Sequence, residues 1–171
     1  TATNNTAIGF EALKATTTGS FNTSVGFNAL KANTTGVVNT AVGDRALDGN
    51  TTGFGNVDVG ASALNNCTTG SDNVAVGFSS LLNNQTGLRS TAIGKDALLT
   101  STNSNNNVAV GFQALKVNTT GTQNTAVGTN AGDLITTGDN NLSLGYQADP
   151  SSATADNEVT LGNSSIATLR C

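Results

Sequence analysis

The chain has 171 residues and a net charge of -4, with 7 Lys and Arg, 11 Asp and Glu, and no His. Because no basic cluster is present, the composition argues against nucleic-acid binding, which depends on Lys and Arg facing phosphates. No apolar run approaches the roughly 20 residues of a membrane-spanning helix, so membrane insertion is not expected. Without histidine the usual general base is missing, and we expect no enzyme, no catalytic residues and no cofactor.

A glycine recurs every 17 residues, and the positions around it repeat in phase. These glycines are Gly9, Gly26, Gly43, Gly60, Gly77, Gly94, Gly111, Gly128, Gly145 and Gly162. Numbered from a leading asparagine, first Asn5, the repeat reads Asn-Thr-Ala-Val-Gly-Phe-x-Ala-Leu-x-x-Asn-Thr-Thr-Gly-x-x. One such unit cannot bury a core alone, whereas stacked copies cover one another. The period therefore predicts an all-β fold, a parallel β-solenoid or β-roll of about ten 17-residue repeats.

Positions 2 to 6 of each repeat predict a short strand, because they are β-branched, alternate and lie between turn residues. Position 4 is always apolar, as in Val42, and we expect it to point into the core. The small residue at position 3, as in Ala41, is then expected on the outer face. The leading asparagines should form a ladder of side-chain amides along the stack.

The second half of the repeat predicts a further inward anchor and a turn. Ala-Leu at positions 8 and 9 is compatible with a second short strand or with one helical turn. Positions 12 to 15, as in Asn33-Thr34-Thr35-Gly36, predict a turn with glycine at positive φ. Each coil offers only about two large apolar side chains, so we expect the solenoid to pack against other chains.

The pattern changes toward the C-terminus. In residues 131–135 the apolar anchor is expected to move to Leu134 and Ile135. The only proline lies in Asp149-Pro150-Ser151-Ser152, and Asn157 comes 16 residues after the preceding leading asparagine, which suggests a slip by one. We therefore predict a repeat shaft over residues 1–145 and a C-terminal transition segment over residues 146–171. Cys67 and Cys171 lie in distant repeats and are not expected to pair.

The acidic residues form no column, and no metal site is expected. Asp58 is the exception, because it occupies position 3, where most repeats carry Ala. If that face met a three-fold axis, three copies of Asp58 could hold a cation, which makes it a weak metal candidate. We favour an exposed, hydrated Asp58, because buried unpaired carboxylates are costly.

Aromatic residues gather at position 6, which makes this column a possible surface-ligand row. Its members are Phe10, Phe27, Phe78, Phe112 and Tyr146. Such a row could stack on sugar rings, or it could pack between coils or chains, which the large buried area of aromatic side chains favours. Interruptions such as Asp44 and Lys95 indicate a partly exposed row.

The repeat pattern Asn-Thr-Ala-Val-Gly-x-x-Ala-Leu-x-x-Asn-Thr-Thr-Gly, which covers nearly the whole chain, resembles the repeats of phage tail fibres. Its Thr-Ala-Val-Gly core, as in Thr40-Ala41-Val42-Gly43, is similar to the repeats of trimeric autotransporter adhesin heads. Residues 156–171 resemble the segment ahead of an intramolecular chaperone of endosialidase type, and the chain stops short of that chaperone. The resemblance implies a homotrimeric fibre in the virion or at the cell surface. Its expected partner is a host glycan or envelope receptor.

The sequence thus predicts a structural or adhesive fibre, and three other functions stay open. A fibre enzyme that degrades surface glycans would carry paired carboxylates across a groove, and the sequence shows no such pair. A bacterial trimeric adhesin head would share the architecture. A monomeric ice-binding solenoid would present one flat threonine face, but the threonine pair is interrupted at Asn84-Gln85-Thr86 and Thr102-Asn103-Ser104.

Overall fold

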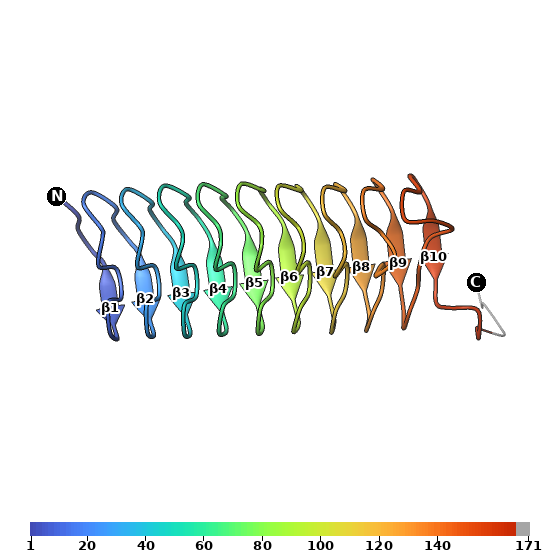
Figure 1. Cartoon of the computed structure of the whole chain (residues 1–171), viewed down its shortest axis with the longest axis horizontal. Coiled ribbons are helices and arrows are strands. Elements are labelled where there is room, and N and C mark those ends of the chain that lie inside the picture. The colour runs from blue at the N-terminus through green and yellow to red at the C-terminus, as the bar shows by residue number, and fades with distance from the viewer. Residues whose placement is uncertain (167–171) are drawn as a thin grey trace.

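The computed structural model describes residues 1–166, which form ten three-residue strands and no helix. The strands are β1 (Thr6–Ile8), β2 (Thr23–Val25), β3 (Thr40–Val42), β4 (Val57–Val59), β5 (Val74–Val76), β6 (Thr91–Ile93), β7 (Val108–Val110), β8 (Thr125–Val127), β9 (Leu142–Leu144) and β10 (Val159–Leu161). They pair in chain order into one parallel sheet, and the chain makes one coil between successive strands (Figure 1). The predicted all-β parallel solenoid is confirmed.

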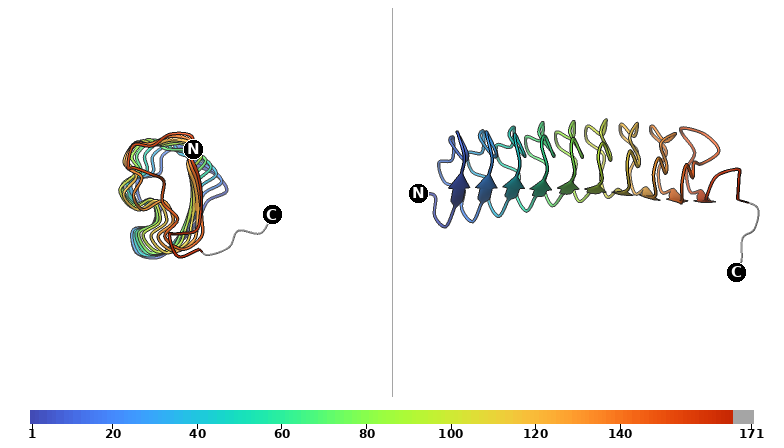
Figure 2. Two further views of the ribbon diagram at one scale, coloured as in Figure 1. Left: turned by 90° about the vertical axis from the view of Figure 1, so that its right-hand side faces the viewer. Right: turned by 90° about the horizontal axis from the view of Figure 1, so that it is seen from below.

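Every strand pairs with the equivalent residues of the next coil. Val42 lies opposite Val59, and at the C-terminal end Val159 lies opposite Leu142. The last coil is therefore in register, and the slip predicted from Asn157 is wrong, because Glu158 holds position 1. The stack of strands also continues beyond the predicted boundary at residue 145, and the loop that contains Pro150 leaves the pairing intact. Viewed end-on, the coils superpose closely (Figure 2).

The two faces of the sheet are reversed relative to the prediction. Position 3 points inward and is fully buried, as at Ala41, Ala75 and Ala109. Position 4 points outward, and Val59 is 39% exposed. Because side chains alternate along a strand, an error of one position moves every residue to the other face. The coil is narrow, and the leucine of position 9 with the asparagines of positions 1 and 12 leaves room only for small side chains at position 3.

The recurring glycine of position 5 is required for both conformation and space. In the coils of β1 to β9 its φ lies between +114° and +144°, a region that L side chains rarely adopt. A Cβ at Gly60 would also lie 2.6 Å from the carbonyl oxygen of Gly77 in the next coil. The glycine of position 15 is different, because its φ is not positive. A Cβ at Gly53 would lie 2.2 Å from the carbonyl oxygen of Gly70, so this glycine is needed for close stacking.

Left-handed residues bend the remainder of each coil. Positions 7, 9 and 17 have φ near +55° in most coils, for example Asn28 at 57°, Leu30 at 50° and Val38 at 58°. The Ala-Leu segment is therefore neither a second strand nor a helical turn. The leucine still points inward as predicted, and Leu30 is fully buried with Ala29. Farther along, Ile135 is buried whereas Leu134 is 43% exposed, so only one of the two predicted anchors enters the core.

Buried amides run along the stack as predicted. The side chain of Asn39 donates to Asn22 Oδ1 at 3.2 Å and to the carbonyl oxygen of Gly53 at 2.9 Å. The same pattern recurs from coil to coil, and Ser90 continues the ladder, because its backbone N–H donates to Asn73 Oδ1. Threonines at position 13 form a second ladder to backbone carbonyls, as in Thr34 to Thr51 at 2.9 Å. Satisfied buried amides fix the register of neighbouring coils.

Candidate interaction surface

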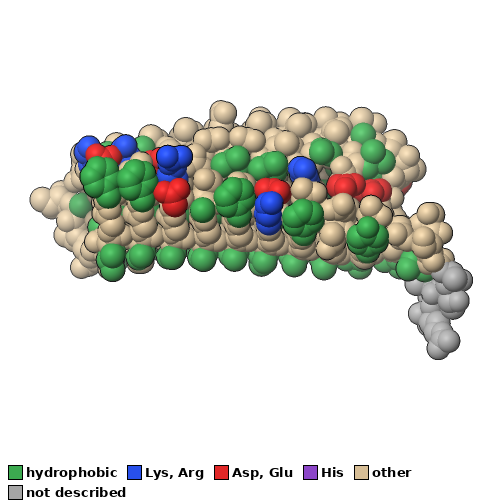
Figure 3. Space-filling model, turned by 60° about the horizontal axis from the view of Figure 1, so that its bottom comes forward, with side chains coloured by type: hydrophobic (Ala, Val, Ile, Leu, Met, Phe, Trp, Pro, Cys, Tyr) green, Lys and Arg blue, Asp and Glu red, His purple; other side chains and the backbone are tan. Residues whose placement is uncertain are grey.

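The outer face of the sheet is an exposed strip without charged residues. Position 2 contributes threonine, valine or leucine, and position 4 contributes valine, isoleucine or leucine, in all ten coils. The large apolar side chains exposed on this strip are Ile8, Val57, Val59, Ile93, Val127, Leu144, Val159 and Leu161. Rows of hydrophobic side chains follow the long axis of the molecule (Figure 3). An uncharged and largely apolar surface of this length is typical of an interaction site.

The five aromatic residues of position 6 are all exposed. They lie just after the C-terminal ends of their strands, in a row along one side of the sheet. The rings of Phe10 and Phe27 stack with centroids 5.4 Å apart and an interplanar angle of 11°. The ammonium group of Lys95 lies 5.8 Å from the centroid of Phe78 and 5.9 Å from that of Phe112. Tyr146 continues the row and is 57% exposed. The sequence predicted this column, and the structure leaves both of its interpretations, stacking on a ligand or packing between chains, available.

A second exposed apolar cluster, which was not predicted from the sequence, lies just before the N-terminal ends of the strands, on the opposite side of the sheet. It consists of Phe21, Val37, Val38 and Phe54, at positions 16 and 17 of the first three coils. In later coils the same positions carry mostly polar residues, such as Asn106 and Gln123. The sequence contained one sign of this cluster. Positions 16 and 17 have no consensus residue, yet they carry large apolar residues in a few neighbouring repeats.

Asp58 lies inside the coil stack and not at a surface or an axis between chains. Its side chain is fully buried, and neither carboxylate oxygen has a hydrogen-bond partner. Desolvation by burial raises the pKa of this carboxyl well above its usual value of 3.8. Both sequence-based interpretations of Asp58, a cation site between chains and a hydrated surface residue, are therefore wrong. By contrast, Ser24 at the same position donates to the carbonyl oxygen of Ala29 at 2.7 Å.

Cys67 is a free, buried thiol that replaces an asparagine of the second amide column, at position 12. Burial, and then the nearby Asp58, raise its pKa to about 12, so the thiol is neutral and unreactive. Its Sγ lies 3.6 Å from the carbonyl oxygen of Gly70, the group that asparagine contacts in other coils. Cys171 lies outside the described residues.

A groove of about 970 Å³ crosses the first five coils. Its lining residues belong to positions 10 to 13 of the repeat, about half a repeat after the strand in sequence. In the first three coils small residues at position 11 line it, namely Ala15, Ala32 and Gly49. In the fourth coil this position carries Asn66, which also lines the groove.

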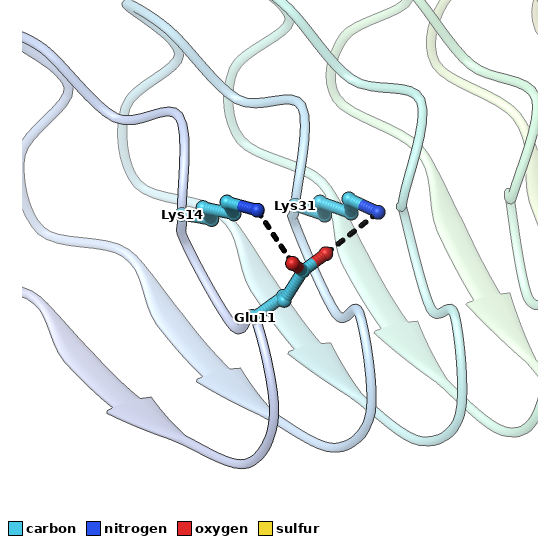
Figure 4. A network of polar contacts seen from close by, with 3 residues as sticks. All are labelled: Glu11, Lys14 and Lys31. Carbon is cyan, nitrogen blue, oxygen red and sulfur yellow. Dashed lines mark hydrogen bonds and ion pairs between the residues drawn. The ribbon is translucent and has the colours of Figure 1, made fainter.

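A charged network borders this groove. Glu11 pairs with Lys14 of its own coil at 2.5 Å and with Lys31 of the next coil at 2.7 Å (Figure 4). The hydrogen bond from Lys14, and then that from Lys31, lowers the pKa of Glu11. The hydrogen bond that Lys31 donates to Glu11 raises the pKa of Lys31. Since all three groups are solvated, the network contributes little stability, and it partly neutralises the two cations.

Within residues 1–166, no three His, Cys, Asp or Glu side chains gather in a way that could hold a metal ion. The same part of the chain contains no helix long and apolar enough to cross a membrane. Comparisons with protein families, curated proteins and solved structures give no match to this chain.

Proposed function

We propose that this chain is a structural and adhesive fibre protein, the trimeric shaft or receptor-binding region of a phage tail fibre that contacts the host cell surface. The observation that carries the proposal is the uncharged outer face of the sheet, on which apolar side chains are exposed or partly exposed in every coil. Burial of this face stabilises an assembly by about 25 cal/mol for each Å² removed from water. The proposed location is the virion or the extracellular surface.

A closed ring of chains would bury the whole outer face of each sheet. With the solenoid axes parallel and the sheets turned inward, each chain buries its whole strip against the same surface of its neighbours. The number three comes from the resemblance of the repeats to trimeric fibres and adhesin heads. The core of one chain is thin, because most inward side chains are alanine, leucine or asparagine, and a shared interior would add the apolar area that each chain lacks.

The polar ladders suit a mechanical role. Each coil is held to the next by backbone pairs, by the asparagine ladder and by the threonine ladder. These bonds lie along the long axis, so bending or pulling the rod would break many of them together. Contact with a host glycan or envelope receptor would use side chains left on the outside of the trimer, among them the border of the groove.

A bacterial trimeric adhesin head is the nearest alternative, since it would use the same surface in the same way. The gene context separates the two proposals. A chaperone segment of endosialidase type after residue 171 supports the tail fibre, whereas a membrane anchor there supports the adhesin.

An ice-binding solenoid is a second candidate, and one observation favours it. The flat outer face carries threonine at position 2 in five coils: Thr6, Thr23, Thr40, Thr91 and Thr125. The other coils carry valine or leucine there, which breaks the threonine file. Ice binding requires this face to be free in solution, and a trimer requires it to be covered.

Light scattering of the 171-residue chain tests the proposal. We expect the mass of three chains and no thermal hysteresis. Val59→Glu places a charge in the middle of the strip and should dissociate the assembly, because a buried unpaired carboxylate is costly. Thr69→Glu, on an exposed turn away from the sheet, is the matched control and should leave the mass unchanged. A folded wild-type monomer would overturn the trimeric fibre, and thermal hysteresis of that monomer would support ice binding.

A further inference from the structure

We propose that the groove over the first five coils binds an uncharged oligosaccharide. The inference rests on the proposed function, an adhesive fibre that contacts the host cell surface, and it names the site and the class of glycan. A volume of about 970 Å³, lined by small apolar residues and a few polar groups, is typical of ligand-binding pockets. The groove lies at positions 10 to 13 of the repeat, so it does not overlap the outer face of the sheet that the proposed trimer covers.

The groove offers an elongated surface with an apolar part. The methyl groups of Ala15 and Ala32 line it and can contact the C–H face of a sugar ring. The lining runs from Lys14 in the first coil to Gln85 in the fifth, about 19 Å at the spacing of parallel strands. This is the length of a short oligosaccharide in an extended conformation.

Asp48 provides a hydrogen-bond acceptor inside the groove. Among residues 1–166 no ion pair reaches its carboxylate, because Lys31, on the neighbouring coil, pairs with Glu11 instead. Desolvation by burial raises the pKa of Asp48, although the nearby Lys31 and Arg45 act in the opposite direction. This carboxylate is therefore partly withdrawn from water and would gain from a donor on a ligand, such as a sugar hydroxyl.

Donors lie on both sides of Asp48 along the groove. An ammonium group has several N–H donors, and Glu11, which lies between Lys14 and Lys31, accepts one from each (Figure 4). The remaining donors can bind hydroxyl or carbonyl oxygens of a ligand. The side-chain amides of Asn65 line the groove farther along and can donate and accept. Donors and acceptors that alternate beside an apolar surface suit a chain of hydroxylated rings.

The charges around the groove favour an uncharged glycan over a polyanion. The first three coils contain equal numbers of cations and anions. These are Lys14, Lys31, Arg45, Glu11, Asp44 and Asp48. A polyanion would require an excess of cations along the groove, which this part of the chain does not offer.

An extended peptide is a poorer ligand for this groove, because the backbone beside it has no free edge. The N–H groups of Ala15, Ala32 and Gly49 donate to carbonyl oxygens of the next coil at 3.0, 3.0 and 2.9 Å. A peptide strand that adds to a sheet requires unpaired backbone groups. The ligand must therefore be recognised through side chains.

Binding of uncharged hexasaccharides to the whole chain tests the site. The panel consists of maltohexaose, cellohexaose, mannohexaose and chitohexaose, with hexagalacturonate as the anionic counterpart. We expect saturation-transfer NMR to detect at least one uncharged member, and titration calorimetry to show tighter binding of this member than of hexagalacturonate. Failure of every uncharged member to bind, or tighter binding of hexagalacturonate, would overturn the proposed class of ligand.

Filling the groove locates the binding site. Ala32→Leu should abolish the binding, because leucine occupies part of the groove. The fold accepts leucine at position 11, which is Leu134 in the eighth coil. Val117→Leu makes a similar change at position 11 of the seventh coil, outside the groove, and should bind like the wild type. Equal binding by the two variants would overturn the site.

Asp48→Asn tests the acceptor and should weaken binding roughly tenfold, because a hydrogen bond to a charged group is replaced by one to a neutral amide. Asp133→Asn changes position 10 of the eighth coil, outside the groove, and should leave the affinity unchanged. Equal effects of both would overturn the role of Asp48. Light scattering of the same samples separates the two proposals. A trimer without binding would overturn the site and leave the fibre intact, whereas a monomer that binds would overturn the trimer and leave the site.

Discussion

Gly132 and Ile135 together replace the buried leucine of the other coils, because Ile135 enters the space that Gly132 leaves open. Position 9 is leucine in the first seven coils, but in the eighth it is Gly132, whose φ of +64° resembles that of the leucines. Ile135, at the asparagine position 12, is only 1% exposed. A Cβ on Gly132 would lie 2.8 Å from Leu115 Cδ2 and 3.4 Å from Ile135 Cδ1. Ile135 therefore fills the space that a leucine at position 132 would occupy.

This replacement predicts strong coupling between the two positions. Gly132→Leu should destabilise the protein by about 1–3 kcal/mol through overpacking. Ile135→Asn should cost about 2–5 kcal/mol by removing a core side chain. The double variant restores the consensus and should lose less than the sum of the two, with a coupling of at least about 1 kcal/mol. Urea unfolding at one fixed protein concentration measures all four forms, and simple additivity would contradict the replacement.

Asp58 should destabilise the protein at neutral pH. Its pKa is raised in the folded state, so its contribution to stability is fully present below the ordinary value of 3.8 and is lost as the pH rises through the folded pKa. Asp58→Asn removes this loss and should raise the melting temperature near neutral pH, with little gain below pH 3.8. Asp44→Asn changes an exposed carboxylate and is the control. An equal gain at both pH values would argue against a buried, neutral Asp58.

Gly60→Ala should destabilise the protein by more than about 2 kcal/mol, because it combines an unfavourable φ of +138° with a contact of 2.6 Å to the next coil. Gly55→Asn is the matched control. Gly55 has a φ of +67°, and asparagine adopts this left-handed conformation at the same position 17, in Asn106. Thermal unfolding followed by circular dichroism compares the two. Similar losses would mean that contact between coils is not what selects glycine at position 5.

Asn73→Asp tests the amide ladder with almost no change of shape. Asn73 donates to the Gly87 carbonyl oxygen at 2.9 Å and to Asn56 Oδ1 at 3.2 Å, and a carboxylate cannot donate either bond. We expect a loss of at least about 1–3 kcal/mol, the usual cost of unsatisfied buried polar groups. Asn106→Asp makes the same change at an exposed position where Asp72 already has a φ of 58° in another coil. It should be nearly neutral in chemical denaturation.

Only part of the candidate interaction surface could be predicted from the sequence. The aromatic row was found because its members share one position of the repeat. The cluster of Phe21, Val38 and Phe54 was missed, because it occupies two positions in a few coils and belongs to no consensus. Asp58 was recognised as unusual, but its placement depended on which face of the strand points inward.

The sequence by itself determined the period, the parallel stacking and the in-register ladders, because a spacing of 17 residues brings like side chains above one another. The direction of each side chain was decided only by the tertiary structure. Alternation along a strand is symmetric, so the pattern Thr40-Ala41-Val42 suits either face. The left-handed residues at positions 7 and 9 bring Leu47 and the buried asparagines into a narrow interior, where alanine fits and valine does not. That steric limit, and not hydrophobicity, leaves the valines on the outer face.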